Sequence, residues 1–417
     1  MNSYFNFKNT TKALCKEALC LCKEQFDQIE EISRLNQERT LKSFLDCKVS
    51  ESHFSSTTGY GYSDRGREVL DEVYKQIFDA EAALVRHNFV SGTHALTVAL
   101  FGILRPDDTM LCVTGTPYDT IKSVIGFDDK TKKDQGRIVD FGIKYEQTDL
   151  LDNGEIDIER IKKDLKRRPK LVYIQRSKGY SLRRSLLVED IEKICKITRE
   201  ISPDSIIMVD NCYGEYVQTK EPLSVGADLI VGSMIKNPGA GITPTGGYIA
   251  GKKDLVQLCA NRLTTPATGG EDGATLFQNR EMFMGAFHAP KAVGEALKTS
   301  VFASALMQLA GFEVFPKFNE KRGDIVQLIK LGDENKLIKF CQAIQSYSPI
   351  DSFLTPEPWD MPGYNCKIIM SSGSFTMGSS IEISADAPLR EPYCVFLQGG
   401  IDFNSAKIAV MKAFEAI

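Results

Sequence analysis

The sequence predicts an α/β protein with a mostly parallel central sheet in a large unit, followed by a smaller α+β unit. Short apolar segments alternate with longer amphipathic ones between about residues 84 and 250, which is typical of βαβ units. The 417 residues also exceed one ordinary core, so two or three units are expected. We place a helical arm at 1–60, the large unit at 61–288, and a linking helix with the small unit at 289–417.

The individual elements follow from the spacing of apolar residues. Helical spacing predicts the arm over about residues 9–46, a helix over 69–78, the linking helix over 289–309 and a terminal helix over 403–417. In the large unit, strands are expected at residues 83–85, 109–113, 171–174, 206–209, 229–231 and 248–250. In the small unit, strands are expected at 381–384 and 395–398.

The composition is that of a soluble enzyme, with 42% hydrophobic and 25% charged residues. A net charge of -4 lacks the basic excess that nucleic-acid binding requires, so nucleic acid is not expected as a partner. Eleven cysteines at irregular spacings indicate reduced thiols and a cytoplasmic protein. There is no signal-peptide pattern, the longest apolar run is too short to cross a bilayer, and no metal site is expected.

Two residues at predicted strand ends carry groups that suggest chemistry. Asp210 follows the apolar run in SIIMVDNCYGEY, at the sheet edge where ligands bind in open α/β folds, although such an aspartate is also a common helix N-cap. Lys236, in DLIVGSMIKNPG, stands between an apolar run and small residues. The alternative for Lys236 is a plain surface lysine.

A third group is an expected anion site. In FVSGTHAL a turn formed by Ser91, Gly92 and Thr93 precedes an apolar helix, whose first N–H groups suit a phosphate, or else form only a helix cap. Pyridoxal 5'-phosphate (PLP) chemistry requires a lysine for the imine, a carboxylate for the pyridine nitrogen and a phosphate cradle. The sequence therefore predicts PLP as cofactor. Tyr118, after the next strand, is placed either to stack on the cofactor ring or to pack in the core.

Four motifs, SGTHA, PYDT, VDNCYGE and GSMIKNPG, occur in this order. With them the chain resembles the fold-type-I PLP enzymes, and more narrowly the cystathionine-lyase and methionine γ-lyase-related group known as aluminium-resistance proteins. The similarity extends over nearly the whole chain, from TTGYGYSDRGRE to APLREPYCVFLQGGI. These motifs are specific for the group and much less specific for one reaction.

The resemblance implies a role for each motif residue. Lys236 would be the Schiff-base lysine and Asp210 the partner of the pyridine nitrogen, while Tyr118 would stack on the ring and help to protonate a leaving sulfur. The phosphate would be held by the turn at Ser91, Gly92 and Thr93 and by the hydroxyl of Ser233. Ile235 stands where a hydroxyl residue is often found, so one phosphate contact is missing or replaced.

The resemblance also implies a homo-oligomer, a dimer of dimers. In related enzymes a Tyr-x-Arg from the neighbouring subunit clasps the phosphate. Tyr60 and Tyr62 lie in the comparable loop, but neither Arg65 nor Arg67 reproduces that spacing, so which arginine acts stays open, with Arg67 counted among the cofactor-binding candidates.

Arginines supply the candidates for holding the substrate carboxylate, because the guanidinium fork matches a carboxylate. Arg390, in APLREP, is the first candidate, with half of a surface ion pair as the alternative. Gln175 and Arg176, at the end of LVYIQRSKGY, lie at another strand edge, and Arg176 is the second candidate.

Together these features predict a PLP-dependent carbon–sulfur lyase acting on cystathionine, cysteine or methionine by β- or γ-elimination. Another reaction at Cα, such as decarboxylation, aldol cleavage or transamination, would use the same lysine and aspartate. A PLP-binding, stress-linked protein with little turnover is a third possibility. The chain has no HExxH motif, no Ser-His-Asp pattern and no GxGxxG opening a βα unit, so zinc, triad and dinucleotide chemistry are disfavoured.

Overall fold

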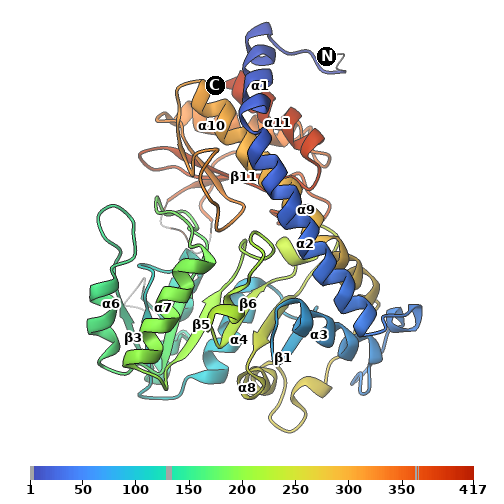
Figure 1. Ribbon diagram of the computed structural model, residues 1–417, viewed down its shortest axis with the longest axis vertical. Helices are drawn as coiled ribbons and strands as arrows, with labels where there is room; N and C mark the ends of the chain where they lie inside the picture. Colours follow the sequence, from blue (N-terminus) through green and yellow to red (C-terminus); the bar gives the residue numbers. More distant parts are fainter. Residues whose placement is uncertain (1–3, 128–133, 362–363, 365) are drawn as a thin grey trace.

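The computed structural model describes residues 4–127, 134–361, 364 and 366–417. A larger part is built around a seven-stranded sheet and a smaller part around a five-stranded sheet, the smaller one uppermost in Figure 1. Helix α9 (Asn279–Leu309) packs against elements of both parts. It begins earlier than predicted and continues through Pro290, so the expected boundary after residue 288 falls inside this helix.

The predicted arm consists of two helices, α1 (Asn9–Leu21) and α2 (Lys23–Asp46), which meet at Cys22. α2 lies alongside α9 (Figure 1), and Ser33 Oγ donates a hydrogen bond to the carbonyl oxygen of Pro290 at 3.0 Å. A Cβ on Gly294 would lie 3.1 Å from Ser33 Oγ, so glycine permits this close approach. The arm is therefore packed on its own chain.

The large sheet has the strand order β1-β7-β6-β5-β4-β2-β3. Its strands are β1 (Ala82–Arg86), β2 (Thr109–Cys112), β3 (Lys144–Gln147), β4 (Leu171–Gln175), β5 (Ile206–Asp210), β6 (Leu229–Ser233) and β7 (Gly247–Gly251). Only β7 runs antiparallel to its neighbours, β1 and β6. All six predicted strands are present. The unpredicted β3 is a polar edge strand, which leaves no apolar pattern to detect.

Helices cover both faces of this sheet, because successive strand residues point to opposite sides. Met208 packs in one apolar cluster, with residues of α4 (Gly92–Ile103), α5 (Asp119–Ile125) and α8 (Lys253–Leu263). Its neighbours Ile207 and Val209 pack in the other cluster, whose helices are α3 (Arg65–Ile77), α6 (Ile158–Leu165), α7 (Val188–Ile201) and α9. The central strands are therefore buried on both sides.

The small sheet is antiparallel, with the order β10-β11-β12-β9-β8. Its elements are β8 (Glu313–Phe315), β9 (Gln327–Lys330), α10 (Glu334–Ser346), β10 (Ile368–Ser371), β11 (Ser384–Pro388), β12 (Cys394–Gln398) and α11 (Phe403–Ala416). The position of the strand predicted at 381–384 is wrong. The observed strand, β11, begins at Ser384, where the predicted strand was expected to end. The strand predicted at 395–398 and the terminal helix are confirmed.

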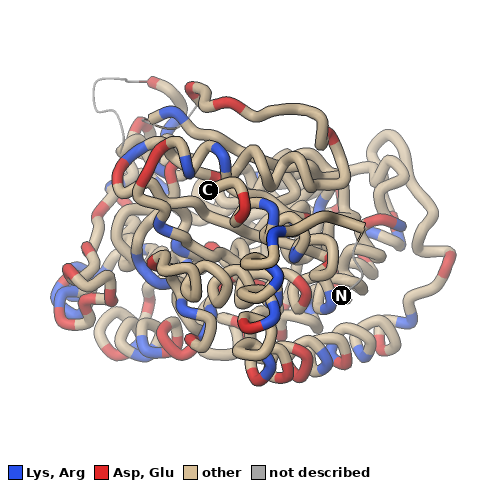
Figure 2. Tube along the Cα trace, turned by 90° about the horizontal axis from the view of Figure 1, so that it is seen from above, with Lys and Arg blue, Asp and Glu red and all other residues tan. Residues whose placement is uncertain are grey.

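Charged residues of both signs are distributed along the chain. Figure 2 shows Lys and Arg interspersed with Asp and Glu along the chain. Within the described ranges, none of the helices combines the length and apolar character needed to cross a bilayer.

Candidate active site

Three adjacent parallel strands bring the predicted residues together. β4 ends at Gln175, β5 at Asp210 and β6 at Ser233, and these strands pair in register. Lys236 follows β6 and precedes a short 3-10 turn, Asn237–Gly239. The carboxyl ends of parallel strands form the usual ligand site of an open α/β sheet, so the strand order alone places Asp210 and Lys236 at one edge.

Asp210 is buried, with 7% of its surface exposed. Its Oδ1 accepts a hydrogen bond from the N–H of Cys212 at 3.1 Å, and its Oδ2 accepts one from the hydroxyl of Tyr173 at 3.3 Å. Burial raises the pKa of this carboxyl, while the charge of Lys236 acts to lower it. No Lys, Arg or His of the described residues forms an ion pair with Asp210, so a protonated pyridine nitrogen suits this position.

The amine of Lys236 lies over an aromatic ring. Its Nζ is 4.0 Å from the centroid of Tyr213. Burial works to lower the pKa of Lys236, but Cys212, Tyr213 and Asp210 around it raise the pKa above its ordinary value. The amine of Lys236 must lose its ammonium proton before it can form an imine. A second positive charge beside Asp210, such as a pyridinium, would promote that loss.

The turn that opens α4 adjoins the same edge. Ser91 is the N-cap, and its Oγ accepts from the N–H of His94 at 3.0 Å, whereas the N–H groups of Gly92 and Thr93 meet no acceptor among the described residues. A Cβ on Gly92 would lie 3.1 Å from Ser233 Cβ and 3.6 Å from Cys212 Sγ. Unused N–H groups at a helix N-terminus, beside a serine hydroxyl, fit a phosphate. The residues present therefore fit PLP.

Tyr118 is fixed by two polar contacts. Its backbone N–H donates to Gln175 Oε1 at 2.6 Å, which gives Gln175 a positioning role that its place in the sequence did not assign. The hydroxyls of Tyr118 and Tyr364 are 2.6 Å apart. Burial raises the pKa of Tyr118 well above its ordinary value. Its phenol is therefore protonated at neutral pH and suited to donate a proton rather than accept one.

Arg390 lies on the rim of the site and is exposed. Its Nη2 donates to the carbonyl oxygen of Tyr180 at 3.5 Å. Together with Tyr118, Gln175 and Lys178 it lines a cavity of about 50 Å³. Its predicted role in holding the substrate carboxylate stays a prediction, and this position on the rim is compatible with it.

Arg176 is placed differently, because its guanidinium is fully buried behind the strand edge. Nη1 donates to Asn211 Oδ1 at 2.8 Å and to Glu221 Oε2 at 3.3 Å, and Nη2 donates to Gln218 Oε1 at 3.3 Å. The substrate-binding role of Arg176 also stays a prediction. In that role the guanidinium would have to break these hydrogen bonds and form new ones to the substrate carboxylate.

In the loop expected to reach a neighbouring subunit, two tyrosines are exposed to solvent, whereas Arg67 is buried. Tyr60 and Tyr62 are 75% and 54% exposed, and their rings stack with centroids 5.5 Å apart. Arg67 is 2% exposed and donates to three backbone carbonyl oxygens at 2.6 to 3.0 Å. Arg65, the first residue of α3, is exposed. The predicted contact of Arg67 with a phosphate stays a prediction, and Arg65 has the more accessible position.

Several side chains near Lys236 were not anticipated. Tyr213 and Glu215 belong to the VDNCYGEY motif itself, so the motif contained a signal for them. Glu215 is fully buried, and burial raises its pKa to about 8. Tyr180 and Asp386 are more than 200 residues apart in sequence, and the hydroxyl of Tyr180 donates to Asp386 Oδ2 at 3.3 Å. Only the tertiary fold brings this pair together.

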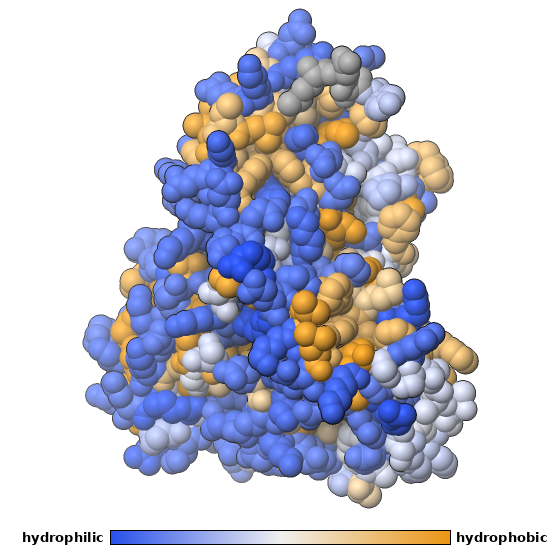
Figure 3. Space-filling model, turned by 45° about the vertical axis from the view of Figure 1, so that its right-hand side comes forward, coloured by the Kyte–Doolittle hydropathy of each residue, from blue (hydrophilic) through white to orange (hydrophobic). Residues whose placement is uncertain are grey.

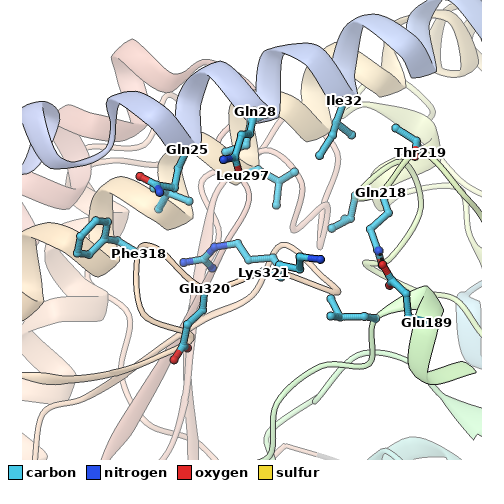
Figure 4. Close-up of a pocket in the computed structure, with 15 residues that line it drawn as sticks. Gln25, Gln28, Ile32, Glu189, Gln218, Thr219, Leu297, Phe318, Glu320 and Lys321 are labelled. Atoms are coloured by element: carbon cyan, nitrogen blue, oxygen red, sulfur yellow. Dashed lines mark hydrogen bonds between the residues drawn. The ribbon is translucent and has the colours of Figure 1, made fainter.

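A separate cavity of about 240 Å³ lies between α2 and loops of both parts (Figure 4). Its lining includes Gln28 and Ile32 from α2, Leu297 from α9, and Gln218 and Lys321 from the loops, as Figure 4 shows. None of the predicted site residues lines it. It is therefore distinct from the candidate active site.

Comparisons with known proteins show which family this chain matches. The sequence model of the family "Methionine gamma-lyase" matches residues 11–417. Protein YnbB of Bacillus subtilis is 45% identical over 390 residues, covering 94% of this chain and 92% of YnbB.

Two solved structures are also closely similar. A candidate cystathionine β-lyase involved in aluminium resistance from Clostridium acetobutylicum has a TM-score of 0.96 and 48% identity, covering 99% of this chain and 96% of that one. A carbon–sulfur lyase involved in aluminium resistance from Clostridium novyi NT has a TM-score of 0.94 and 50% identity, covering 98% and 96%. The predicted fold-type-I architecture of PLP enzymes is confirmed.

Proposed function

Because this chain belongs to the methionine γ-lyase family, we propose that it is a PLP-dependent carbon–sulfur lyase acting on a sulfur amino acid such as cystathionine, cysteine or methionine. The observation that carries the proposal is the convergence of Lys236, Asp210 and the N-terminus of α4 at one sheet edge. PLP, when bound, supplies an electron sink that stabilises negative charge at Cα.

In this proposal each side chain has one task. Arg390 orients the substrate through its α-carboxylate, Lys236 removes the proton from Cα, and Asp210 keeps the pyridine nitrogen protonated. Tyr118, whose buried phenol is protonated, donates a proton to the leaving sulfur. The Cα–H and C–S bonds break, the C–S electron pair leaves with sulfur as a thiol, and hydrolysis of the remaining enamine gives a 2-oxo acid and ammonium. Loss of sulfur from Cγ requires one further proton transfer.

We also place the enzyme in the cytoplasm as a dimer of dimers. All eleven cysteines are unpaired, which suits a reducing compartment. Tyr60 and Tyr62 are exposed, as are Leu276 and Phe277 on a loop that hydrogen-bonds to their segment. Apolar side chains also gather in patches on the face in Figure 3. Such surfaces are typical of subunit contacts.

The test is a screen of the purified holoenzyme with cystathionine, cysteine and methionine. Elimination predicts a 2-oxo acid, ammonium and thiol in equal amounts. Decarboxylation would release carbon dioxide and an amine instead, and transamination would form a 2-oxo acid without thiol. Absence of all products, with no change in the cofactor spectrum, would contradict the proposal and favour a binding protein with little turnover.

A further inference from the structure

The cavity between α2 and the loops of both parts is separate from the candidate active site. Its volume is about 240 Å³, and apolar side chains form much of its wall, among them Ile29 and Ile32 from α2, Leu297 from α9 and Phe318 from the loop between β8 and β9. Figure 4 shows Ile32 and Leu297 directed into the space beneath α2. A concave apolar surface of this kind favours a ligand with an apolar part.

One wall of the cavity holds an arginine without an anionic partner. Arg322 is 8% exposed; its Nη2 donates to Gln327 Oε1 at 2.7 Å, but its buried Nε and Nη1 have no hydrogen-bond partner in the described part of the chain. The carboxylate of Asp324 accepts instead from the hydroxyls of Ser177 and Ser185. Burial lowers the pKa of Arg322 to about 10, although the charge of Asp324 acts to raise it. Because buried arginines are usually paired, this guanidinium lacks an anion.

A second cation faces the same space. Lys321 lines the cavity, and Figure 4 shows its side chain extending across the space beneath α2. The two carboxylates in the lining have other partners: Glu189 Oε2 accepts from Nε2 of Gln218 at 2.9 Å, and Glu320 Oε2 accepts from the backbone N–H of Lys317 at 2.8 Å. Among the residues that the structure describes, neither carboxylate forms an ion pair with the two cations. The cavity therefore offers two cations to an incoming anion.

We propose that this cavity binds a small organic acid with a short aliphatic chain, whose carboxylate pairs with Arg322 and Lys321 while the chain contacts the apolar wall. The fork of a guanidinium matches a carboxylate, and an ammonium adds a point charge. The volume lies below the roughly 300–1,000 Å³ typical of sites for drug-sized ligands, which indicates a small molecule. The site is independent of the proposed lyase reaction, because none of the residues assigned to that reaction lines the cavity.

A second cavity, of about 310 Å³, adjoins this one and shares Lys321 and Arg322 in its lining. Its wall also contains the carboxyl groups of Asp190 and Asp324 and has few apolar side chains. An anion in that second cavity would meet negative charge, so the first cavity is the better site for an acid with an aliphatic chain.

Three probes with chains of the same length separate the two features of the site. Calorimetry on the wild-type holoenzyme should give hexanoate a dissociation constant about tenfold or more below that of 1-hexanol, the range for a charged hydrogen bond. Hexylammonium should bind no more tightly than 1-hexanol, and inorganic phosphate, which lacks the chain, should bind more weakly than hexanoate. Equal binding of hexanoate and 1-hexanol, tighter binding of phosphate, or no binding of hexanoate would overturn the proposal.

Binding would also connect segments that are distant in the sequence. The cavity is lined from α2, from α9 and from the loop that carries Arg322, so it exists only in the folded chain. A ligand of the folded state stabilises that state by mass action. At ten times its dissociation constant, hexanoate should raise the melting temperature of the wild type by about 1–2 °C. A melting temperature that stays unchanged or falls would contradict specific binding.

Substitutions of the two cations test where the carboxylate binds. Arg322→Met removes the charge from a side chain of similar length and should weaken hexanoate binding about tenfold or more. Lys321→Gln, at an exposed position, should weaken it about threefold. The matched control Lys317→Gln, exposed in the same loop but outside the lining, should bind hexanoate as the wild type does. Unchanged affinity in Arg322→Met, or in Lys321→Gln if the first variant does not fold, would overturn the proposal.

Hexanoate bound at the candidate active site would give a different pattern. Arg390→Lys would then weaken hexanoate binding, and hexanoate would change the absorption spectrum of the bound cofactor; either result would overturn the proposed second site. We expect Arg390→Lys to bind hexanoate as the wild type does, with the spectrum unchanged. None of these measurements requires turnover. A chain that cleaves no thioether would still show hexanoate binding in the cavity if the site exists, and an active lyase would show none if it does not.

Discussion

Replacing Glu215 by glutamine should remove a pH-dependent loss of stability. Glu215 is fully buried; Oε1 accepts from the hydroxyl of Tyr248 at 2.8 Å, and Oε2 has no hydrogen-bond partner in the described part of the chain. Burial is the main cause that raises its pKa from 4.5 to about 8, and Glu221 adds to it. The folded protein thus keeps a proton that the unfolded chain loses near its ordinary pKa. Stability falls as pH rises through this window.

The size of the effect follows from the two pKa values. At 1.36 kcal/mol per unit, the wild type should lose roughly 3 kcal/mol between pH 5.5 and pH 8 through Glu215, whereas Glu215→Gln should lose none of this. Melting temperatures of both proteins, measured at the two pH values with saturating cofactor, give the comparison. The exposed control Glu17→Gln should follow the wild type. A variant that loses as much stability as the wild type would refute a protonated Glu215.

Three further variants test the site. Lys236→Ala should abolish the borohydride-reducible bond to the cofactor; a pyridoxyl group mapped to another lysine would reject the assignment. Asp210→Asn should keep the cofactor but lose about a hundredfold or more in kcat, since the amide does not stabilise a protonated pyridine nitrogen; unchanged kcat would return Asp210 to a helix cap. Arg390→Lys should lower kcat/KM by about ten- to a hundredfold with the cofactor spectrum intact. Loss of cofactor in this last variant would indicate a different role.

The sequence was most informative where the end of a predicted strand by itself fixes the position of a residue in the fold. Strands buried on both faces are continuous apolar runs, so β4, β5 and β6 were predictable within a residue or two. In a parallel sheet their carboxyl ends meet at one edge, which is why the amino-acid sequence alone could group Asp210 with Lys236. The edge strands β3, β8 and β10 were not predicted because four residues or fewer of edge strand carry no clear alternation. The inner strand β9 was also missed, because its four residues are too short a run to show a period.

The contacts between the two parts were not predictable in the same way. Asp386 is a single acidic residue in a short strand, SADAP, and nothing local distinguishes it from a solvent-exposed aspartate. Its hydrogen bond from Tyr180 arises because the small part packs against Tyr180 and Tyr213, which follow β4 and β5 of the large part. Contacts between two sheets depend on how the connecting helix α9 orients them, and periodicity within either sheet does not encode this orientation.

The partners of the arginines were also not predictable from the sequence. A guanidinium suits a phosphate, a carboxylate or a set of backbone carbonyl oxygens equally well, so its partner cannot be read from the neighbouring residues. Arg67 donates to the carbonyl oxygens of Gly61, Glu271 and Gly273, and thereby joins the segment carrying Tyr60 and Tyr62 to a second loop. If those tyrosines contact a neighbouring subunit, Arg67 acts on that contact through the shape of the loop. The exposed Arg65 is then the arginine with direct access to the neighbour.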